Sequence, residues 1–205
     1  MCGLFASMGA PDVDVVHSIA SRAATRGPHG FGIFATSPEN DTEARLAHAG
    51  DITPFLPEIG DFAHRGVLIG HCRLATSGGA ADHAAMANAQ PITRGRFTIA
   101  HNGTARHAVL NELFSSCDSE ALLAYMDLRI SRPLEYRLQS IDEVVGQGEP
   151  AAVIAYDGEI LHAFSRGLPL FVRQDPGAVY LCSRRFDGAE PLEQARVHRY
   201  KRREL

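Results

Sequence analysis

Residues 151–165 read AAVIAYDGEILHAFS, and this stretch decides the fold class. Two apolar runs lie on either side of Asp157-Gly158, a dipeptide that favours the tight turn of a β-hairpin. Residues 170–183 repeat the arrangement around Asp175-Pro176-Gly177 and predict a second hairpin. Because hairpins join antiparallel neighbours, we expect an antiparallel sheet in this part of the chain.

The segments before these hairpins contain both strand and helix patterns. Short apolar runs predict strands at 2–7, 31–35, 45–49, 67–73 and 97–101. Helical spacing, with Asp12 as the cap of the first helix, occurs at 13–25, 108–114, 119–130 and 133–145. Strands and helices therefore occur in blocks rather than in strict alternation. This order predicts one α+β domain rather than a doubly wound fold.

Composition and charge narrow the possible functions. The chain has 205 residues, 45% of them hydrophobic and 21% charged, which is typical of one globular domain. Its net charge of −4 argues against a nucleic-acid partner. Lys and Arg together number 20, and the only Lys is Lys201. A phosphate-binding P-loop and Schiff-base chemistry both need a lysine in the site, so both are excluded.

The cysteine pattern and the apolar runs favour a cytoplasmic protein. The four cysteines, Cys2, Cys72, Cys117 and Cys182, contain no C-x-x-C pair. This spacing predicts neither a zinc site nor the disulfide framework of a small secreted domain. No apolar run has the length of a signal peptide or a membrane span. We therefore expect reduced thiols, no metal, no other cofactor and no membrane association.

Cys2 is the first candidate for a catalytic residue. Its small side chain permits removal of Met1, which would leave a chain that begins with a thiol and a free α-amine. An α-amine has a pKa of about 7.7–8.0, so it can accept the thiol proton near neutral pH. One residue would then supply both the nucleophile and the general base. The alternative is that Cys2 is simply a small residue at the start of a strand.

Several further segments, in order along the chain, resemble one family. They are CGLF at 2–5, RGPHGFG at 26–32, GHCRLAT at 70–76, NAQP at 88–91, IAHNG at 99–103 and CDSE at 117–120. Together they resemble the glutaminase domain of class II glutamine amidotransferases, as found in amidophosphoribosyltransferase, glutamate synthase and glucosamine-phosphate synthase. The resemblance implies an N-terminal-nucleophile hydrolase fold, a four-layer αββα sandwich of mostly antiparallel sheets.

The resemblance also implies the domain limits. The glutaminase domain is expected at residues 2–190, followed by a basic C-terminal tail at 191–205. Five basic residues lie in this tail: Arg196, Arg199, Lys201, Arg202 and Arg203. Such a charge cluster is typical of a solvated tail, and docking to an acidic partner is the alternative.

The resemblance assigns catalytic roles to three residues. Cys2 would attack the side-chain amide of glutamine and form a thioester. The amide of Asn102 and the backbone N–H of Gly103 would form the oxyanion hole. Taken without the resemblance, Asn102-Gly103 after a strand is typical of a turn.

Substrate-binding and supporting roles follow in the same way. Arg73 would bind the α-carboxylate of glutamine, Thr76 would add a donor to it, and Asp118 would bind the α-ammonium. Without the resemblance, Arg73 is typical of a surface ion pair and Asp118 of a helix cap. The supporting residues are Arg26, Gly27 and Leu74. Leu74 departs from the family, in which an aromatic residue is common at this position.

The implied function is hydrolysis of L-glutamine to glutamate and ammonia. The segment contains no room for the synthase domain that uses the ammonia, so we expect a separate synthase subunit as partner. A stand-alone hydrolase of another γ-glutamyl amide is one alternative. A glutamine-sensing subunit without turnover is another, although the complete set Cys2, Arg73, Asn102-Gly103 and Asp118 argues against it.

Overall fold

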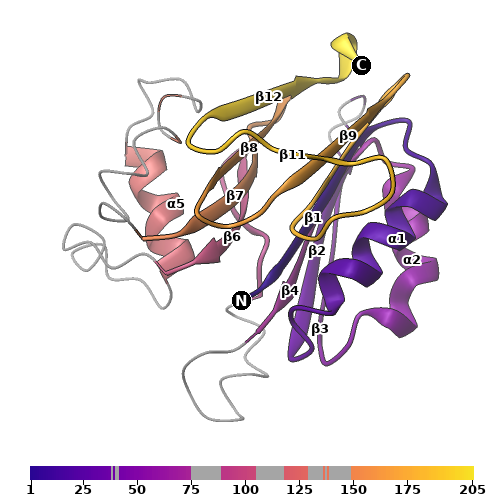
Figure 1. Ribbon diagram of the computed structural model, residues 1–205, viewed down its shortest axis with the longest axis horizontal. Helices are drawn as coiled ribbons and strands as arrows, with labels where there is room; N and C mark the ends of the chain where they lie inside the picture. Colours follow the sequence, from indigo (N-terminus) through magenta and orange to yellow (C-terminus); the bar gives the residue numbers. More distant parts are fainter. Residues whose placement is uncertain are drawn as a thin grey trace.

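Two antiparallel β-sheets stacked face to face form the centre of the protein (Figure 1). The computed structural model describes residues 1–37, 39, 42–74, 89–104, 118–128, 136, 138 and 149–205. Within these residues the first sheet has the order β11-β9-β10-β1-β4-β2-β3 and the second has the order β12-β8-β7-β6-β5. All pairings between these strands are antiparallel, as the hairpin signals predict.

The elements have the following bounds. The first sheet contains β1 (Gly3–Gly9), β2 (Gly30–Ser37), β3 (Thr42–Ala49), β4 (Val67–Arg73), β9 (Phe171–Asp175), β10 (Ala178–Cys182) and β11 (Glu190–Pro191). The second contains β5 (Ile92–Arg94), β6 (Phe97–Gly103), β7 (Ala151–Tyr156), β8 (Ile160–Arg166) and β12 (Val197–Lys201). The helices are α1 (Val13–Ala24), α2 (Leu56–Ala63) and α5 (Asp118–Leu128), with 3-10 turns at Thr53–Phe55 and Arg202–Glu204.

Three apolar clusters show how the layers are packed. Leu4 and Ala6 of β1 belong to a cluster between the sheets that includes Ile154 of β7. Phe5, on the opposite face of β1, belongs to a cluster with the buried side of α1. A third cluster joins β6, β7 and β8 to α5. Helices therefore cover the outer face of each sheet, as Figure 1 shows, and the predicted αββα sandwich is confirmed.

The local signals account for most of these elements. The side chain of Asp12 accepts a hydrogen bond from Asp14 N and caps α1, as predicted. The predicted strands and the predicted helix at 119–130 are present, although the structure describes that helix only to residue 128. The predicted helix at 108–114 lies outside the described residues, as does most of 133–145.

The sequence did not predict α2, β5, β11 or β12. The helix α2 contains Pro57 and Gly60, which weaken a helical pattern. Its Ile59 and Ala63 are nevertheless buried against α1 and the first sheet. Tertiary packing, rather than local propensity, therefore fixes this helix.

The prediction of a separate solvated tail at 191–205 is wrong. Residues 197–201 form β12, which pairs with β8 along its length, with Tyr200 opposite Leu161. Val197 and Tyr200 are buried, whereas the basic side chains between and beyond them are exposed or half-buried. The proposed boundary at residue 190 also falls within β11. The sequence pattern was dominated by the basic residues, which lie at the more exposed positions, so burial of Val197 and Tyr200 was not predicted.

Replacing Tyr200 with Ala should destabilise the protein by about 3–5 kcal/mol, because it removes a buried aromatic side chain from the core between the sheets. Arg203→Ala is the control, because Arg203 is exposed and lies just beyond the end of β12. It should change stability by less than about 0.5 kcal/mol. Urea unfolding monitored by circular dichroism measures both. Equal effects of the two substitutions would contradict the assignment of β12 to the core.

Candidate active site

Cys2 lies at the end of the sandwich where β1 begins and β6 ends. It directly precedes β1, and its backbone N, which follows Met1 in the structure, donates a hydrogen bond of 3.0 Å to Asn102 Oδ1. Asn102 is part of β6 in the other sheet, one hundred positions away in the sequence. Stacking of the two sheets therefore places the predicted nucleophile beside the predicted oxyanion residue.

The Cys2 thiol also contacts the chain that leaves β4. Leu74 N donates to Cys2 Sγ at 3.4 Å, and the Leu74 carbonyl oxygen lies 3.7 Å from the same sulfur. Burial raises the pKa of the Cys2 thiol, while the Leu74 N–H and the charge of Arg73 act in the opposite direction. The resting side chain is therefore a neutral thiol, which needs a base before it can attack.

Asn102 has one side-chain atom bonded and one available. Its Oδ1 accepts from Cys2 N, and a backbone N–H can only donate, so the orientation of the amide is fixed. Its Nδ2 is buried and has no hydrogen-bond partner among the described residues. An unpaired buried donor is costly, and such an atom next to a nucleophile is suited to bind a developing oxyanion.

Gly103 completes this end of β6. Its φ of +145° is unfavourable for other residues, and a Cβ here would lie 2.6 Å from Pro150 O and 2.9 Å from His101 Nε2. A glycine is therefore required. The alternative interpretation of Asn102-Gly103 as a turn is wrong, because both residues belong to β6 and pair with β7.

Arg73 and Asp118 carry opposite charges, and both charges act on the Cys2 thiol. Arg73 is the last residue of β4, and Asp118 is the first residue of α5. Both are half-buried, and both are close enough for their charges to affect the pKa of Cys2. One positive and one negative group therefore lie near the thiol. Thr76, the third predicted binding residue, lies outside the described residues.

Two of the supporting residues hold the chain around the start of β1. Arg26 Nη1 donates to Ser183 O at 2.9 Å, and Ser183 Oγ accepts from Leu4 N at 2.9 Å. A Cβ on Gly27 would lie 2.2 Å from Cys72 O, so only glycine permits this approach to β4. Arg26 and Gly27 thus contact the framework around Cys2.

Sequence reasoning gave no individual role to a group of buried polar residues near the site: His71, Gln90, His101 and Ser119. His71 and His101 lie within β4 and β6, in the strands predicted at 67–73 and 97–101, and both are buried. Burial lowers the pKa of His71 to about 3, and the neighbouring His101 and Arg73 contribute in the same direction. His71 is therefore neutral near pH 7. The NAQP and CDSE segments contained Gln90 and Ser119, but their contact depends on the fold.

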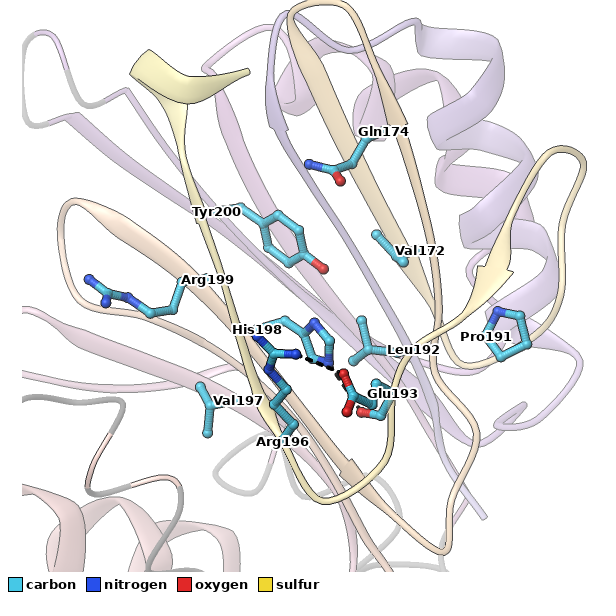
Figure 2. Close-up of a pocket in the computed structure, with 10 residues that line it drawn as sticks. All are labelled: Val172, Gln174, Pro191, Leu192, Glu193, Arg196, Val197, His198, Arg199 and Tyr200. Carbon is cyan, nitrogen blue, oxygen red and sulfur yellow. Dashed lines mark hydrogen bonds and ion pairs between the residues drawn. The ribbon is translucent and has the colours of Figure 1, made fainter.

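A groove of about 540 Å³ lies between β9 and β12, apart from the Cys2 site (Figure 2). Figure 2 shows the Tyr200 ring directed into it from β12, with Val172 of β9 and Leu192 nearby. The ion pair between Arg196 and Glu193, at 2.9 Å, lies at one end. The lining residues do not include any of the predicted site residues.

The described residues contain no group of three or more His, Cys, Asp or Glu side chains placed to hold a metal ion. Within the same parts of the chain, no helix is both long and apolar enough to cross a bilayer.

Comparison with known proteins gives likenesses of sequence and of fold. No family model matches the chain. It is 31% identical over 127 residues to the glutamine–fructose-6-phosphate aminotransferase (isomerizing) of Caulobacter vibrioides, a match that covers 56% of this chain and 20% of the relative. The chain thus spans about a fifth of the length of this relative.

Solved structures agree over nearly the whole chain. The glutamine phosphoribosylpyrophosphate amidotransferase of B. subtilis matches 98% of this chain and 49% of its own, with a TM-score of 0.74 and 21% identity. A glutamine aminotransferase class-II domain protein of Silicibacter pomeroyi matches 98% of this chain and 99% of its own, with a TM-score of 0.59 and 14% identity.

These likenesses show an α+β fold of the N-terminal-nucleophile hydrolase type. The structural neighbours and the curated relative are named as glutamine amidotransferases or glutamine-dependent aminotransferases. The resemblance to class II glutamine amidotransferase domains that the motifs indicated is therefore confirmed.

Proposed function

We propose that the protein hydrolyses the side-chain amide of L-glutamine through a thioester on Cys2, giving glutamate and ammonia. The observation that carries this proposal is the hydrogen bond from Cys2 N to Asn102 Oδ1. It holds the candidate nucleophile beside an amide whose Nδ2 has no other partner among the described residues. The likeness to glutamine amidotransferases supports glutamine as the substrate.

The proposed mechanism begins with removal of Met1, which turns Cys2 N into an α-amine. One amine N–H keeps the bond to Asn102 Oδ1, and the nitrogen lone pair accepts the thiol proton. The sulfur attacks the amide carbon, and Asn102 Nδ2 and the Gly103 N–H stabilise the oxyanion. The ammonium group returns the proton as the C–N bond breaks and ammonia leaves. Water then hydrolyses the thioester and releases glutamate.

The substrate is proposed to lie between the two charged residues. The planar guanidinium of Arg73 suits the α-carboxylate, and the Asp118 carboxylate suits the α-ammonium. Thr76 would add a donor to the α-carboxylate. This arrangement explains how an amide-cleaving site could select an amino-acid amide over a simple amide.

A diazo-ketone analogue of glutamine should label residue 2 of a chain that lacks Met1, because the reactive thiol displaces nitrogen from the analogue. Intact-mass and peptide mass spectrometry locate the adduct. Excess glutamine should slow the labelling, and Cys2→Ala should abolish it. An active preparation that retains Met1, or labelling at Cys72 or Cys182, would overturn the proposal.

Replacing Asn102 should lower kcat for glutamine by about 10²–10³-fold with little change in KM, because an oxyanion donor acts mainly in the transition state. Asn102→Asp is the matched variant for Asn102→Ala. It keeps an acceptor for Cys2 N, replaces the Nδ2 donor with an acceptor and adds a negative charge, which further disfavours an oxyanion. Both variants should be slow in steady-state assays of glutamate release. Turnover near wild type by Asn102→Asp would exclude the oxyanion role.

We further propose that the ammonia acceptor lies outside these 205 residues, on a synthase partner. The fold match takes up 98% of the chain, while the matched part is only 49% of the phosphoribosylpyrophosphate amidotransferase. The part of that relative outside the match has no counterpart among these 205 residues. The competing proposal is a hydrolase that acts on another γ-glutamyl amide without transferring ammonia.

Glutamate release by the purified chain should be slow and should rise several-fold when the acceptor protein is added, because docking favours the closed, competent state of such a site. Proteins encoded beside the gene are the candidates to add, and Cys2→Ala is the blank. A γ-glutamyl alkylamide tests the competing hydrolase. Fast turnover of that compound, unchanged by any candidate, would exclude the synthase partner.

A further inference from the structure

The side chain of Gln90 is buried and bonded at both of its ends. Its Oε1 accepts a hydrogen bond of 2.6 Å from His101 N, the backbone donor just before Asn102. Its Nε2 lies 2.9 Å from Ser119 Oγ. Because a backbone N–H can only donate, the amide orientation is fixed and Nε2 must be the donor to Ser119. Gln90 therefore connects β6 to the beginning of α5.

The network continues from Ser119 to Asp118. Ser119 Oγ already accepts from Gln90, which leaves its hydroxyl proton to be donated. Asp118 Oδ1 lies 3.4 Å away and can accept it, and His101 Nδ1 lies 3.1 Å from the same hydroxyl. When His101 carries its proton on Nδ1, that atom donates to Ser119, and the hydroxyl is directed to the carboxylate. Gln90 and His101 then both donate to Ser119, and Ser119 donates to Asp118.

Both ends of this network are parts of the proposed active site. One end is the backbone next to the oxyanion residues Asn102 and Gly103, and the other is the proposed ligand of the α-ammonium. Glutamine reacts at one end and carries its ammonium at the other. The distance between the two protein groups therefore decides whether both can be engaged at once.

We propose that Gln90 and Ser119 are positioning residues that hold the Asp118 carboxylate at a fixed distance from the oxyanion segment and so select substrates with an α-ammonium. This inference rests on the proposed glutaminase function. It goes beyond it, because it assigns the discrimination to two residues that need not touch the substrate. Burial supports it: Ser119 is 2% exposed and Gln90 9%, so water does not replace their bonds.

The test compares glutamine with glutaramate, the same amide without the α-amino group. Ser119→Ala removes the donor to Asp118, and Gln90→Glu keeps the acceptor for His101 N but removes the donor to Ser119. Each variant should lower kcat/KM for glutamine by about 10–100-fold, mostly through KM, as for loss of a hydrogen bond to a charged group. For glutaramate, kcat/KM should stay within about twofold, because no ammonium is bound.

Ser7→Ala is the matched control. Ser7 is also buried, and its Oγ has no partner among the described residues, so this change removes a buried hydroxyl outside the network. It should leave the ratio of the two kcat/KM values unchanged. A purely structural role for Gln90 and Ser119 would instead lower turnover of both substrates equally.

The outcomes separate the two proposals. If the wild type cleaves glutamine and both network variants keep its preference over glutaramate, the positioning role is overturned and the glutaminase function stands. If the wild type cleaves both compounds equally well, Asp118 does not select the ammonium and the inference fails. If it cleaves neither, the proposed function fails and the inference fails with it. Thermal unfolding of each variant confirms that it is folded during the assay.

Discussion

The hydrogen bond between Cys2 N and Asn102 Oδ1 is the contact on which the site depends, because it joins the two sheets at the proposed nucleophile. It can form only if the start of β1 and the end of β6 lie at the same end of the sandwich. The apolar cluster between the sheets fixes that arrangement, with Leu4 and Ala6 on one side and Ala152 and Ile154 on the other. Burial of these side chains favours one arrangement of the two sheets, and the hydrogen bond then fixes the position of Cys2 relative to Asn102.

The site contains polar groups that the fold does not satisfy among the described residues. Asn102 Nδ2 and both ring nitrogens of His71 are buried without partners there. Each such group costs free energy, and the surrounding apolar core offsets the cost. At Asn102 the unsatisfied donor has a chemical use in the proposed mechanism. At Gln90 and Ser119 the opposite holds, since each bond is made and the geometry becomes rigid.

In the C-terminal segment, a cluster of basic residues surrounds two side chains that pack into the core. Its basic residues suggested a solvated tail, yet Val197 and Tyr200 are core residues of β12. A single buried aromatic anchor contributes more to stability than several exposed charges, whose interactions water and salt weaken. In β12 the strand pairing with β8 and the two anchors therefore decide the structure, and the charges occupy the positions that remain exposed.

Features that depend on near neighbours could be predicted from the sequence alone: the two C-terminal hairpins, the cap at Asp12 and most strand positions. Through its resemblance to a family, the sequence also named Cys2, Arg73, Asn102 and Asp118. The contact of Cys2 with Asn102, the contact of Gln90 with Ser119 and the place of β12 in the second sheet became visible only in the folded protein. Turn propensity and hydrophobic periodicity act over a few residues. Contacts between residues 29 or 100 positions apart depend instead on how whole sheets stack, which local patterns do not specify.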